Sequence, residues 1–189
     1  MVLVLDAPLT DTATLDAFAD ALVAAGHVLG APFVHTGDDA HPGAEAQRFL
    51  SPAGVTVELV DDYDARARYV DVLAVDPADA APVAEVFRQM LPVASTDALV
   101  REATDHLDAF PGVLLRLALG TPLPPPVAVV EAVQRGLVHD RADVRLAAVE
   151  AVGLIGLPPF LEAMQHLRTD DPDEYVRGYA EQTVRLLHG

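Results

Sequence analysis

The chain lacks cysteine, lysine and tryptophan. Without cysteine it can form no disulfide bond, thiolate metal site or cysteine nucleophile, and a reducing compartment is expected. Long apolar runs are also missing. The N-terminal MVLVL stretch is followed by acidic residues rather than by a basic flank and a long hydrophobic segment. We therefore predict neither a signal peptide nor a membrane span, and we expect a soluble, cytoplasmic protein.

Positive charge is scarce as well. The chain holds 29 acidic residues against 12 arginines, which gives a net charge of −17, and residues 1–95 alone hold 15 acids and 4 arginines. Such a surface repels a nucleic-acid backbone, because affinity for nucleic acid comes largely from lysine and arginine. It attracts a basic protein. The alternative is that the acidity only maintains solubility.

The first 95 residues alternate between strand-like and helix-like periodicities. An apolar run at 2–5 predicts a strand, and apolar residues at helical spacing predict an amphipathic helix over 12–25 that ends at Gly26. The elements predicted next are an irregular edge strand at 27–35, a polar loop at 36–42, two strands at 55–59 and 69–75 joined by a charged connection, and a helix that begins at Pro77. Together they predict a small α+β layer with both helices on one face of the sheet.

From about residue 92 the pattern is helical throughout. Apolar residues in 97–108 fall on one side of a helix, and Ser95 or Thr96 is available as its N-cap. We therefore divide the chain into an α+β domain, residues 1–95, and an all-α domain of stacked helical hairpins, residues 96–189.

The helical part repeats itself with a period of 32 residues. Val144-Arg145-Leu146-Ala147-Ala148 recurs as Val176-Arg177-Gly178-Tyr179-Ala180, and a weaker copy, Leu115-Arg116-Leu117-Ala118, precedes both. The acidic turns before the two stronger copies hold Asp140 and Asp143 in one case and Asp170, Asp171, Asp173 and Glu174 in the other. A single helical hairpin cannot bury its apolar face alone, so repeated hairpins of this kind stack on their neighbours.

An acidic turn, a Val-Arg pair and a following alanine resemble the HEAT repeat. The short period is most similar to the HEAT-like repeats named after phycobilisome lyases, and the resemblance covers residues 112–189. It implies a right-handed stack of antiparallel helix pairs. It also implies core positions for Val144, Ala148, Val176 and Ala180, and pairing of Arg145 and Arg177 with the turn carboxylates Asp140, Asp143, Asp171 and Asp173. We interpret the two arginines as structural rather than as an anion site.

The best candidate for metal chemistry is the predicted loop His35-Thr36-Gly37-Asp38-Asp39-Ala40-His41. Imidazole and carboxylate groups bind zinc or manganese, so His35, Asp38, Asp39 and His41 are candidate ligands. Their spacing matches no known metal signature, and the same residue types are typical of a solvated turn. We therefore predict no resident metal or cofactor.

Nucleophilic catalysis has few candidates. Ser51 and Ser95 are the two serines, and neither lies in a Gly-x-Ser-x-Gly motif. The sequence also has no glycine-rich phosphate loop. We therefore expect a protein that is not an enzyme.

Two kinds of function remain. In the first, an acidic face binds a basic protein partner, either to neutralise it, as small acidic immunity proteins of bacterial toxin systems do, or to serve as a scaffold. This face would include Asp61, Asp62 and Asp64 of the predicted hairpin tip and Asp38 and Asp39 of the predicted loop. In the second, the chain is similar to HEAT-like DNA glycosylases or to a lyase-like chaperone. Glycosylases need a basic concave face and aromatic residues, so a net charge of −17 and the lack of tryptophan favour the binding protein.

Overall fold

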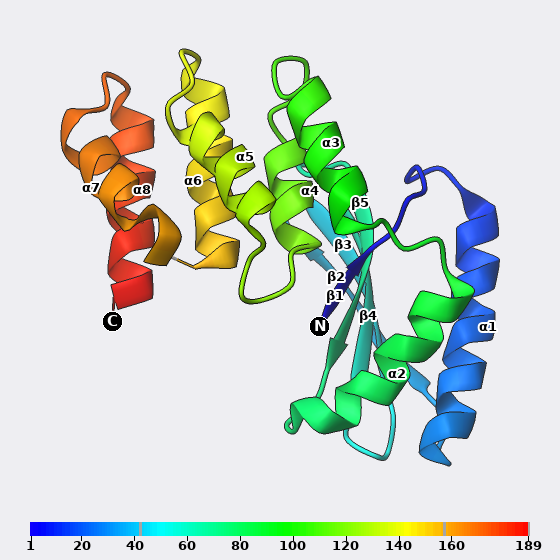
Figure 1. Ribbon diagram of the computed structural model, residues 1–189. Coiled ribbons are helices and arrows are strands. Elements are labelled where there is room, and N and C mark those ends of the chain that lie inside the picture. Colours follow the sequence, from blue (N-terminus) through cyan, green and yellow to red (C-terminus); the bar gives the residue numbers. More distant parts are fainter. Residues whose placement is uncertain (42, 157, 189) are drawn as a thin grey trace. The chain divides into compact units, whose positions relative to one another are not determined.

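The computed structural model describes residues 1–41, 43–156 and 158–188, and for His41 and His188 it describes the backbone alone. The chain forms two compact units, Met1–Ala94 and Ser95–Gly189. The first combines a sheet with two helices and the second is a helical stack (Figure 1). The predicted α+β class is therefore confirmed. The division into two domains at residue 95 stays a prediction.

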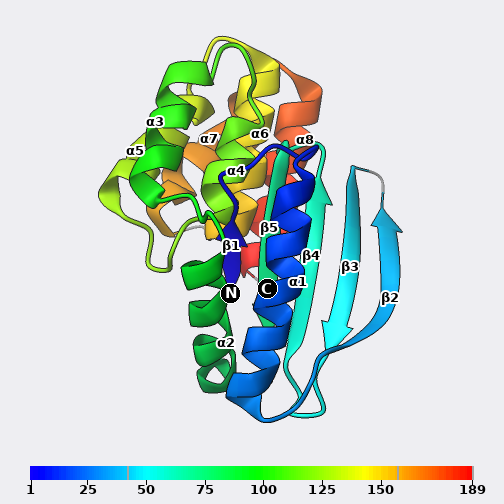
Figure 2. The ribbon, with the colours of Figure 1, turned by 90° about the vertical axis from the view of Figure 1, so that its right-hand side faces the viewer.

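The first unit is a five-stranded antiparallel sheet with two helices on one face. Its strands are β1 (Val2–Val4), β2 (Val34–His41), β3 (Ala44–Leu50), β4 (Thr56–Asp62) and β5 (Ala67–Leu73), in the order β1-β5-β4-β3-β2. The helices are α1 (Thr12–Leu29) and α2 (Pro77–Met90). Buried residues of α1, α2, β1, β4 and β5 form one core, which includes Phe18, Phe87, Leu3, Val57 and Val70. Strands β3 and β2 extend beyond the helices (Figure 2).

Helix α1 is longer than the sequence predicts. It begins after the N-cap Asp11, which accepts hydrogen bonds from the backbone N–H of Ala13 and the hydroxyl of Thr14. It ends at Gly30 rather than at Gly26, because Gly30 adopts the left-handed conformation with φ 65°. Gly26 has a different role: a Cβ there would lie 3.2 Å from the carbonyl oxygen of Ala31, so glycine lets the chain fold back closely after the helix ends.

The edge strand predicted at 27–35 is confirmed only at 34–35, and the loop predicted at 36–42 is wrong for 36–41, while Pro42 lies outside the described residues. Residues 27–29 are the last turn of α1, and 34–41 form the edge strand β2. β2 pairs with β3, a strand that the sequence analysis missed. All described side chains of β2 are exposed, so neither face requires the apolar alternation that identifies a strand in a sequence.

The other predictions for the first unit are confirmed. The segments 55–59 and 69–75 correspond to β4 and β5, which form an antiparallel hairpin. Its connection is shorter than predicted because Asp61 and Asp62 belong to β4. Helix α2 begins at Pro77 after the N-cap Asp76, whose carboxylate accepts from the N–H of Ala78.

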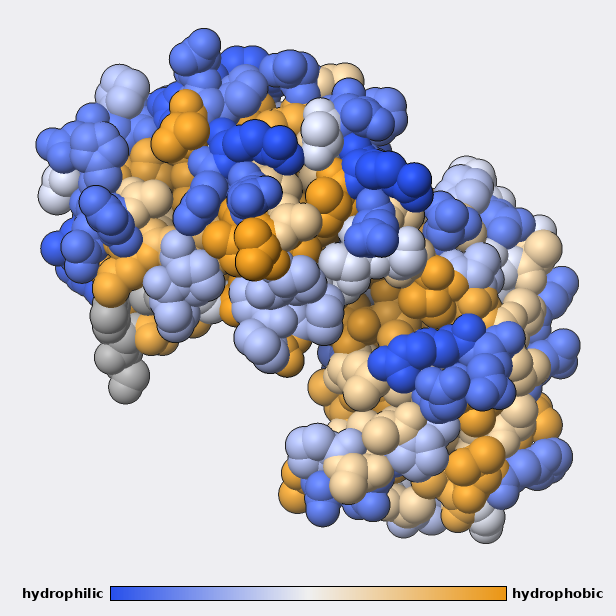
Figure 3. All heavy atoms as spheres, in the orientation of Figure 1, coloured by the Kyte–Doolittle hydropathy of each residue, from blue (hydrophilic) through white to orange (hydrophobic). Residues whose placement is uncertain are grey.

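The second unit stacks three helical hairpins. They pair α3 (Thr96–His106) with α4 (Val113–Leu119), α5 (Val127–Leu137) with α6 (Ala142–Ile155), and α7 (Leu161–Asp170) with α8 (Glu174–His188), and a 3-10 turn, η1 (Pro158–Phe160), precedes α7. Helices α4, α6 and α8 pack in one layer, and α3, α5 and α7 form the other. Ser95 caps α3 by accepting from the N–H of Ala98, as one predicted alternative has it. In this unit hydrophilic residues gather along the upper edge of the view, where the turns within the hairpins lie (Figures 1 and 3).

The four repeat positions assigned to the core by resemblance are all buried. Val144, Ala148 and Ala180 have 0% of their surface exposed, and Val176 has 1%. They lie on α6 and α8, which are neighbours in the layer formed by α4, α6 and α8. Their small or branched side chains allow these two helices to pack closely.

Gly136 and Gly178 provide a test of this packing by the same substitution in two environments. A Cβ at Gly136 in α5 would lie 2.6 Å from Cδ1 of Leu114 and 2.9 Å from Cβ of Ala148, whereas one at Gly178 in α8 meets nothing within 4 Å. We expect Gly178→Ala to raise the free energy of unfolding by about 0.5–1 kcal/mol, because alanine forms helix better than glycine. We expect Gly136→Ala to lower it by about 1–3 kcal/mol through overpacking. Urea denaturation measures both, and shifts of the same sign would contradict the structure.

Candidate functional site

An open groove of about 300 Å³ lies beside α1 on the helix-facing side of the sheet. It is lined by Leu15 of α1, Asp38, Asp39 and Ala40 of β2, Glu45, Ala46 and Gln47 of β3, Leu59 and Asp61 of β4, and Arg68 of β5. Four of these residues are acidic. We call this feature the acidic groove. It exists because α1 covers β4 but leaves most of β3 and β2 exposed.

Strand register aligns the charged side chains of the acidic groove. Ala40 pairs with Glu45, Glu45 with Asp61, and Asp61 with Arg68, so the four residues form one row across β2, β3, β4 and β5. Side chains directly opposite each other on antiparallel strands project to the same face. The row therefore places two carboxylates and one guanidinium side by side.

Arg68 is the cationic residue of this row and is only 3% exposed. Its Nε and Nη2 donate to the two carboxylate oxygens of Asp61 at 2.6 and 2.8 Å. Its remaining bonds reach the backbone carbonyls of Asp11 at 3.0 Å and Leu9 at 2.9 Å. Asp61 thus neutralises Arg68, and the pair ties the segment before α1 to the sheet. The charge of Asp61 is therefore balanced within the protein by Arg68.

Glu45 is an exposed carboxylate of the groove that sequence reasoning missed. Burial raises the pKa of Tyr63, and a hydrogen bond with Glu45 and the negative charges of Glu45 and Asp61 raise it further. The phenol therefore stays protonated at neutral pH and donates to Glu45. No signal in the sequence placed Glu45 beside Asp61, because β3 itself was not predicted.

The predicted metal ligands do not converge. Nε2 of His35 lies 2.8 Å from Oδ1 of Asp38, while Asp39 pairs with Arg48 at 3.2 Å. Successive residues of a strand project to opposite faces, so Asp38 and Asp39 point apart. The side chain of His41 lies outside the described residues. Within the part of the chain that the structure describes, no three His, Asp or Glu side chains form a group that could hold a metal ion.

The five acids predicted to bind a partner lie at one end of the sheet but have different surroundings. Asp38 and Asp61 line the acidic groove on the helix-facing side. Asp39 lines it as well, but its carboxylate is held by Arg48, which also binds Glu58. Asp62 accepts a hydrogen bond from the N–H of Ala65 and so stabilises the turn after β4. Asp64 lies in that turn, against Gly43 of the adjacent β2–β3 turn.

In the helical unit, Arg145 links one repeat to the next. Its Nε and Nη2 donate to the two carboxylate oxygens of Asp171 at 2.7 and 2.9 Å, and its Nη1 donates to the carbonyls of His139 and Asp140 at 2.8 Å each. Arg177 binds the carbonyl of Asp171 at 2.6 Å. Among the turn acids named by the resemblance, Asp171 provides the paired carboxylate. Asp143 instead binds Arg141, and Asp173 caps α8 by accepting from the N–H of Tyr175.

The corresponding link between the first and second repeats is different. His139 stands 32 residues before Asp171 and, like it, accepts a backbone N–H two residues later, from Arg141 to Nδ1 at 3.2 Å. Nδ1 is the acceptor of this bond, and Nε2 lies 3.1 Å from Oδ1 of Asp108. Arg116, the arginine of the first repeat, pairs with Glu102 of α3 at 3.1 Å. The arginine link across repeats thus joins the second and third hairpins.

The helical unit thus consists of repeated hairpins with buried Val and Ala positions, and an arginine of one repeat binds the acidic turn of the next. Residues 108–185 match the family model of HEAT repeats. The predicted HEAT resemblance is confirmed for this region, while its assignment to the phycobilisome lyase type stays a prediction and the N-terminal region is unassigned. HEAT repeats generally serve as scaffolds for protein–protein interaction. No curated protein and no solved structure matches the chain significantly.

Across 1–41, 43–156 and 158–188, no helix is both long and apolar enough to cross a membrane.

The link between HEAT repeats can be tested at Asp171, whose side chain is 1% exposed in its pair with Arg145. We expect Asp171→Asn to lower the free energy of unfolding by about 3 kcal/mol near neutral pH, because it leaves a buried guanidinium without a counterion. Asp143→Asn, which alters the exposed pair with Arg141, is the matched control and should change stability little. Similar losses in both variants would contradict a special role for the buried pair.

The pKa of Asp171 predicts that the free energy of unfolding depends on pH. Burial raises its pKa, but hydrogen bonds from Arg145 and Asp173 and the charges of Arg145 and Arg177 outweigh burial, so the net pKa lies below the usual 3.8. A lowered folded-state pKa adds stability above pH 3.8 that is lost as the pH falls through the folded-state value. Denaturation curves below pH 3.8 should therefore bring wild type and Asp171→Asn closer together than at neutral pH. A constant difference would contradict this assignment.

Proposed function

We propose that the protein is a non-enzymatic binding protein whose acidic groove receives a basic segment of a partner protein. The carrying observation is that two carboxylates of the groove, Asp38 and Glu45, are not paired with an arginine. Of the described residues that line it, Arg68 alone is positively charged, and Asp61 neutralises it. Asp38 and Glu45 are left to face solvent, and their side chains receive bonds from His35 and Tyr63 respectively rather than from arginine.

The charge distribution supports this proposal at longer range. The first unit contains 15 acids and 4 arginines, so its net charge is −11. Such a field steers a basic partner toward the groove and raises its rate of association. The apolar side chains of Leu15 and Leu59 in the same groove would contact the aliphatic stem of a lysine or arginine.

The helical unit supports a binding role independently of charge. A HEAT-repeat region generally provides a scaffold for protein contacts. Neutralising a basic toxin, as an immunity protein does, and holding a basic partner on a scaffold make the same physical demand on the groove. Affinity capture from the source cells, followed by mass spectrometry, distinguishes these by the identity of the partner. Capture of a nucleic acid or of a small metabolite instead of a basic protein would overturn the proposal.

Two double variants distinguish an effect of the acidic groove on binding from an effect of the total charge. Asp38→Lys with Glu45→Lys reverses two carboxylates of the groove, while Asp20→Lys with Glu85→Lys makes the same change in total charge on exposed positions of α1 and α2. We expect the groove variant to weaken binding of the captured partner about tenfold or more, and the control to affect it far less. Surface plasmon resonance at two salt concentrations measures both. Equal losses would show that only overall charge matters.

A further inference from the structure

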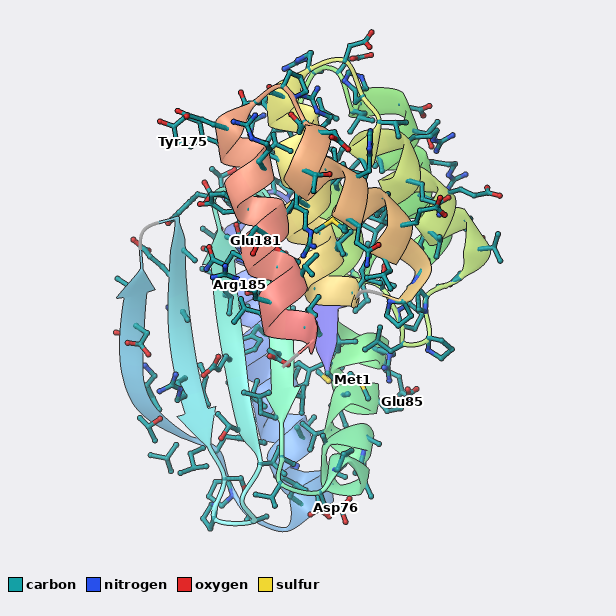
Figure 4. All side chains as sticks on the ribbon, turned by 90° about the vertical axis from the view of Figure 1, so that its left-hand side faces the viewer. Met1, Asp76, Glu85, Tyr175, Glu181 and Arg185 are labelled. Atoms are coloured by element: carbon teal, nitrogen blue, oxygen red, sulfur yellow. The ribbon has the colours of Figure 1, made fainter. Side chains whose placement is uncertain are left out.

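Strand β2 forms an open edge of the sheet. It is the last strand in the order β1-β5-β4-β3-β2, and among the described residues of the first unit only β3 pairs with it. The strand is eight residues long, and the side chains of 34–40 are all exposed. Figures 2 and 4 show β2 at the border of the sheet. The unpaired backbone groups of such an edge can receive a further strand.

Bonds at the two ends of β3 show which backbone groups of β2 are unpaired. At one end the N–H of Tyr63 donates to the carbonyl of Gly43, and at the other the N–H of Ser51 donates to the carbonyl of Val55. Residues of an antiparallel pair alternate between bonded and non-bonded positions. The residues of β3 with odd numbers therefore bond to β4, and those with even numbers bond to β2.

Asp38 and Ala40 direct their backbone N–H and C=O groups away from β3. Asp39 pairs with Ala46, so it is bonded to β3, and its two neighbours in the strand take the alternate positions. Asp38 and Ala40 also line the acidic groove. The unpaired backbone groups and the acidic groove therefore meet at the same two residues.

The row across the sheet shows what side chain an added strand would carry. Ala40 begins the row that continues with Glu45, Asp61 and Arg68. A residue added opposite Ala40 projects its side chain to the same face. Strands lie about 4.8 Å apart and the alanine side chain is short, so a lysine or arginine at that position can extend over Ala40 to Glu45. A basic residue opposite Asp38 meets its carboxylate directly.

We propose that the basic segment of the partner binds in an extended conformation as an additional strand, antiparallel to β2, with one basic residue opposite Ala40 and another opposite Asp38. This inference rests on the proposed function and specifies the conformation and the residue pattern of the segment. In the antiparallel direction each basic residue exchanges two hydrogen bonds with a single residue of β2. The recognised pattern is basic-x-basic, because the middle residue faces the other side of the sheet.

Charge favours a basic partner over a second copy of the chain at this edge. β2 holds two aspartates and neither lysine nor arginine, and each copy has a net charge of −17. Pairing β2 with β2 of a second copy brings the aspartates of both copies together, and charged side chains on an edge strand discourage such association. The same aspartates attract a strand that carries lysine or arginine.

Amide hydrogen exchange of the full chain, measured by NMR, tests the added strand. The probe is the acetylated and amidated peptide Thr-Val-Lys-Thr-Lys-Val-Thr. The control, Thr-Val-Lys-Lys-Thr-Val-Thr, has the same composition but projects its lysines to opposite faces, so it should bind about fivefold or more weakly. Near saturation, the probe should slow exchange of the Asp38 and Ala40 amides about tenfold and affect the Asp39 amide far less. Protection without this alternation overturns the inference.

N-methylation of the probe separates hydrogen bonding from charge. A methyl group on the backbone nitrogen of either lysine removes a donor that faces β2, so binding should weaken about tenfold or more. A methyl group on the nitrogen of the central threonine points away from β2 and should be tolerated. If the probe and both methylated peptides bind equally, the groove binds basic segments without adding a strand, which overturns this inference alone. If no peptide binds, this inference fails, and the double variants of the groove decide separately whether the proposed function fails.

Discussion

Arg68 and Arg145 place a guanidinium in the interior of each unit, and each binds one carboxylate through Nε and Nη2 and also donates to two backbone carbonyls. The carbonyls are bound by Nη1 and Nη2 in Arg68 and by Nη1 alone in Arg145. A planar guanidinium suits this task because its donors form a fixed fork that matches a carboxylate. Arg68 joins the segment before α1 to β4 and β5. Arg145 joins the turn before α6 to the turn before α8. In a chain without cysteine, these two residues act as polar cross-links between segments distant in sequence.

Because some arginines form ion pairs inside the units, fewer positive charges remain on the surface. Arg68 and Arg145 neutralise Asp61 and Asp171, and Arg48 neutralises acids on the sheet face opposite the helices. Few cations are left to balance the other carboxylates of the first unit. The acidic groove follows from this distribution together with the incomplete cover of the sheet, since α1 leaves the helix-facing side of β3 and β2 open. Of its four acidic residues, Asp61 and Asp39 pair with Arg68 and Arg48, whereas Asp38 and Glu45 pair with no arginine among the described contacts.

The HEAT-repeat region is held together differently from the first unit. Its interior is built from small and branched side chains that recur with the repeat, such as Val144 and Val176. Its turns are polar, and one of them supplies the carboxylate of Asp171 that binds Arg145.

The sequence by itself determined the elements whose signals are local. The amphipathic helices, the N-caps Asp76 and Ser95 and the repeat of Val, Arg and Ala were all visible there, because capping and helical periodicity depend on residues a few positions apart. Tertiary structure alone decided the rest. β2 has no apolar face to reveal it and is a strand because β3 offers hydrogen bonds. Glu45 lies beside Asp61 only through the register of β3 on β4. The resemblance named four turn acids as partners of Arg145 and Arg177, and only the packing selects Asp171 as the carboxylate that binds Arg145. Pairing and burial at such distances depend on the packed chain as a whole, which no local pattern of residues records.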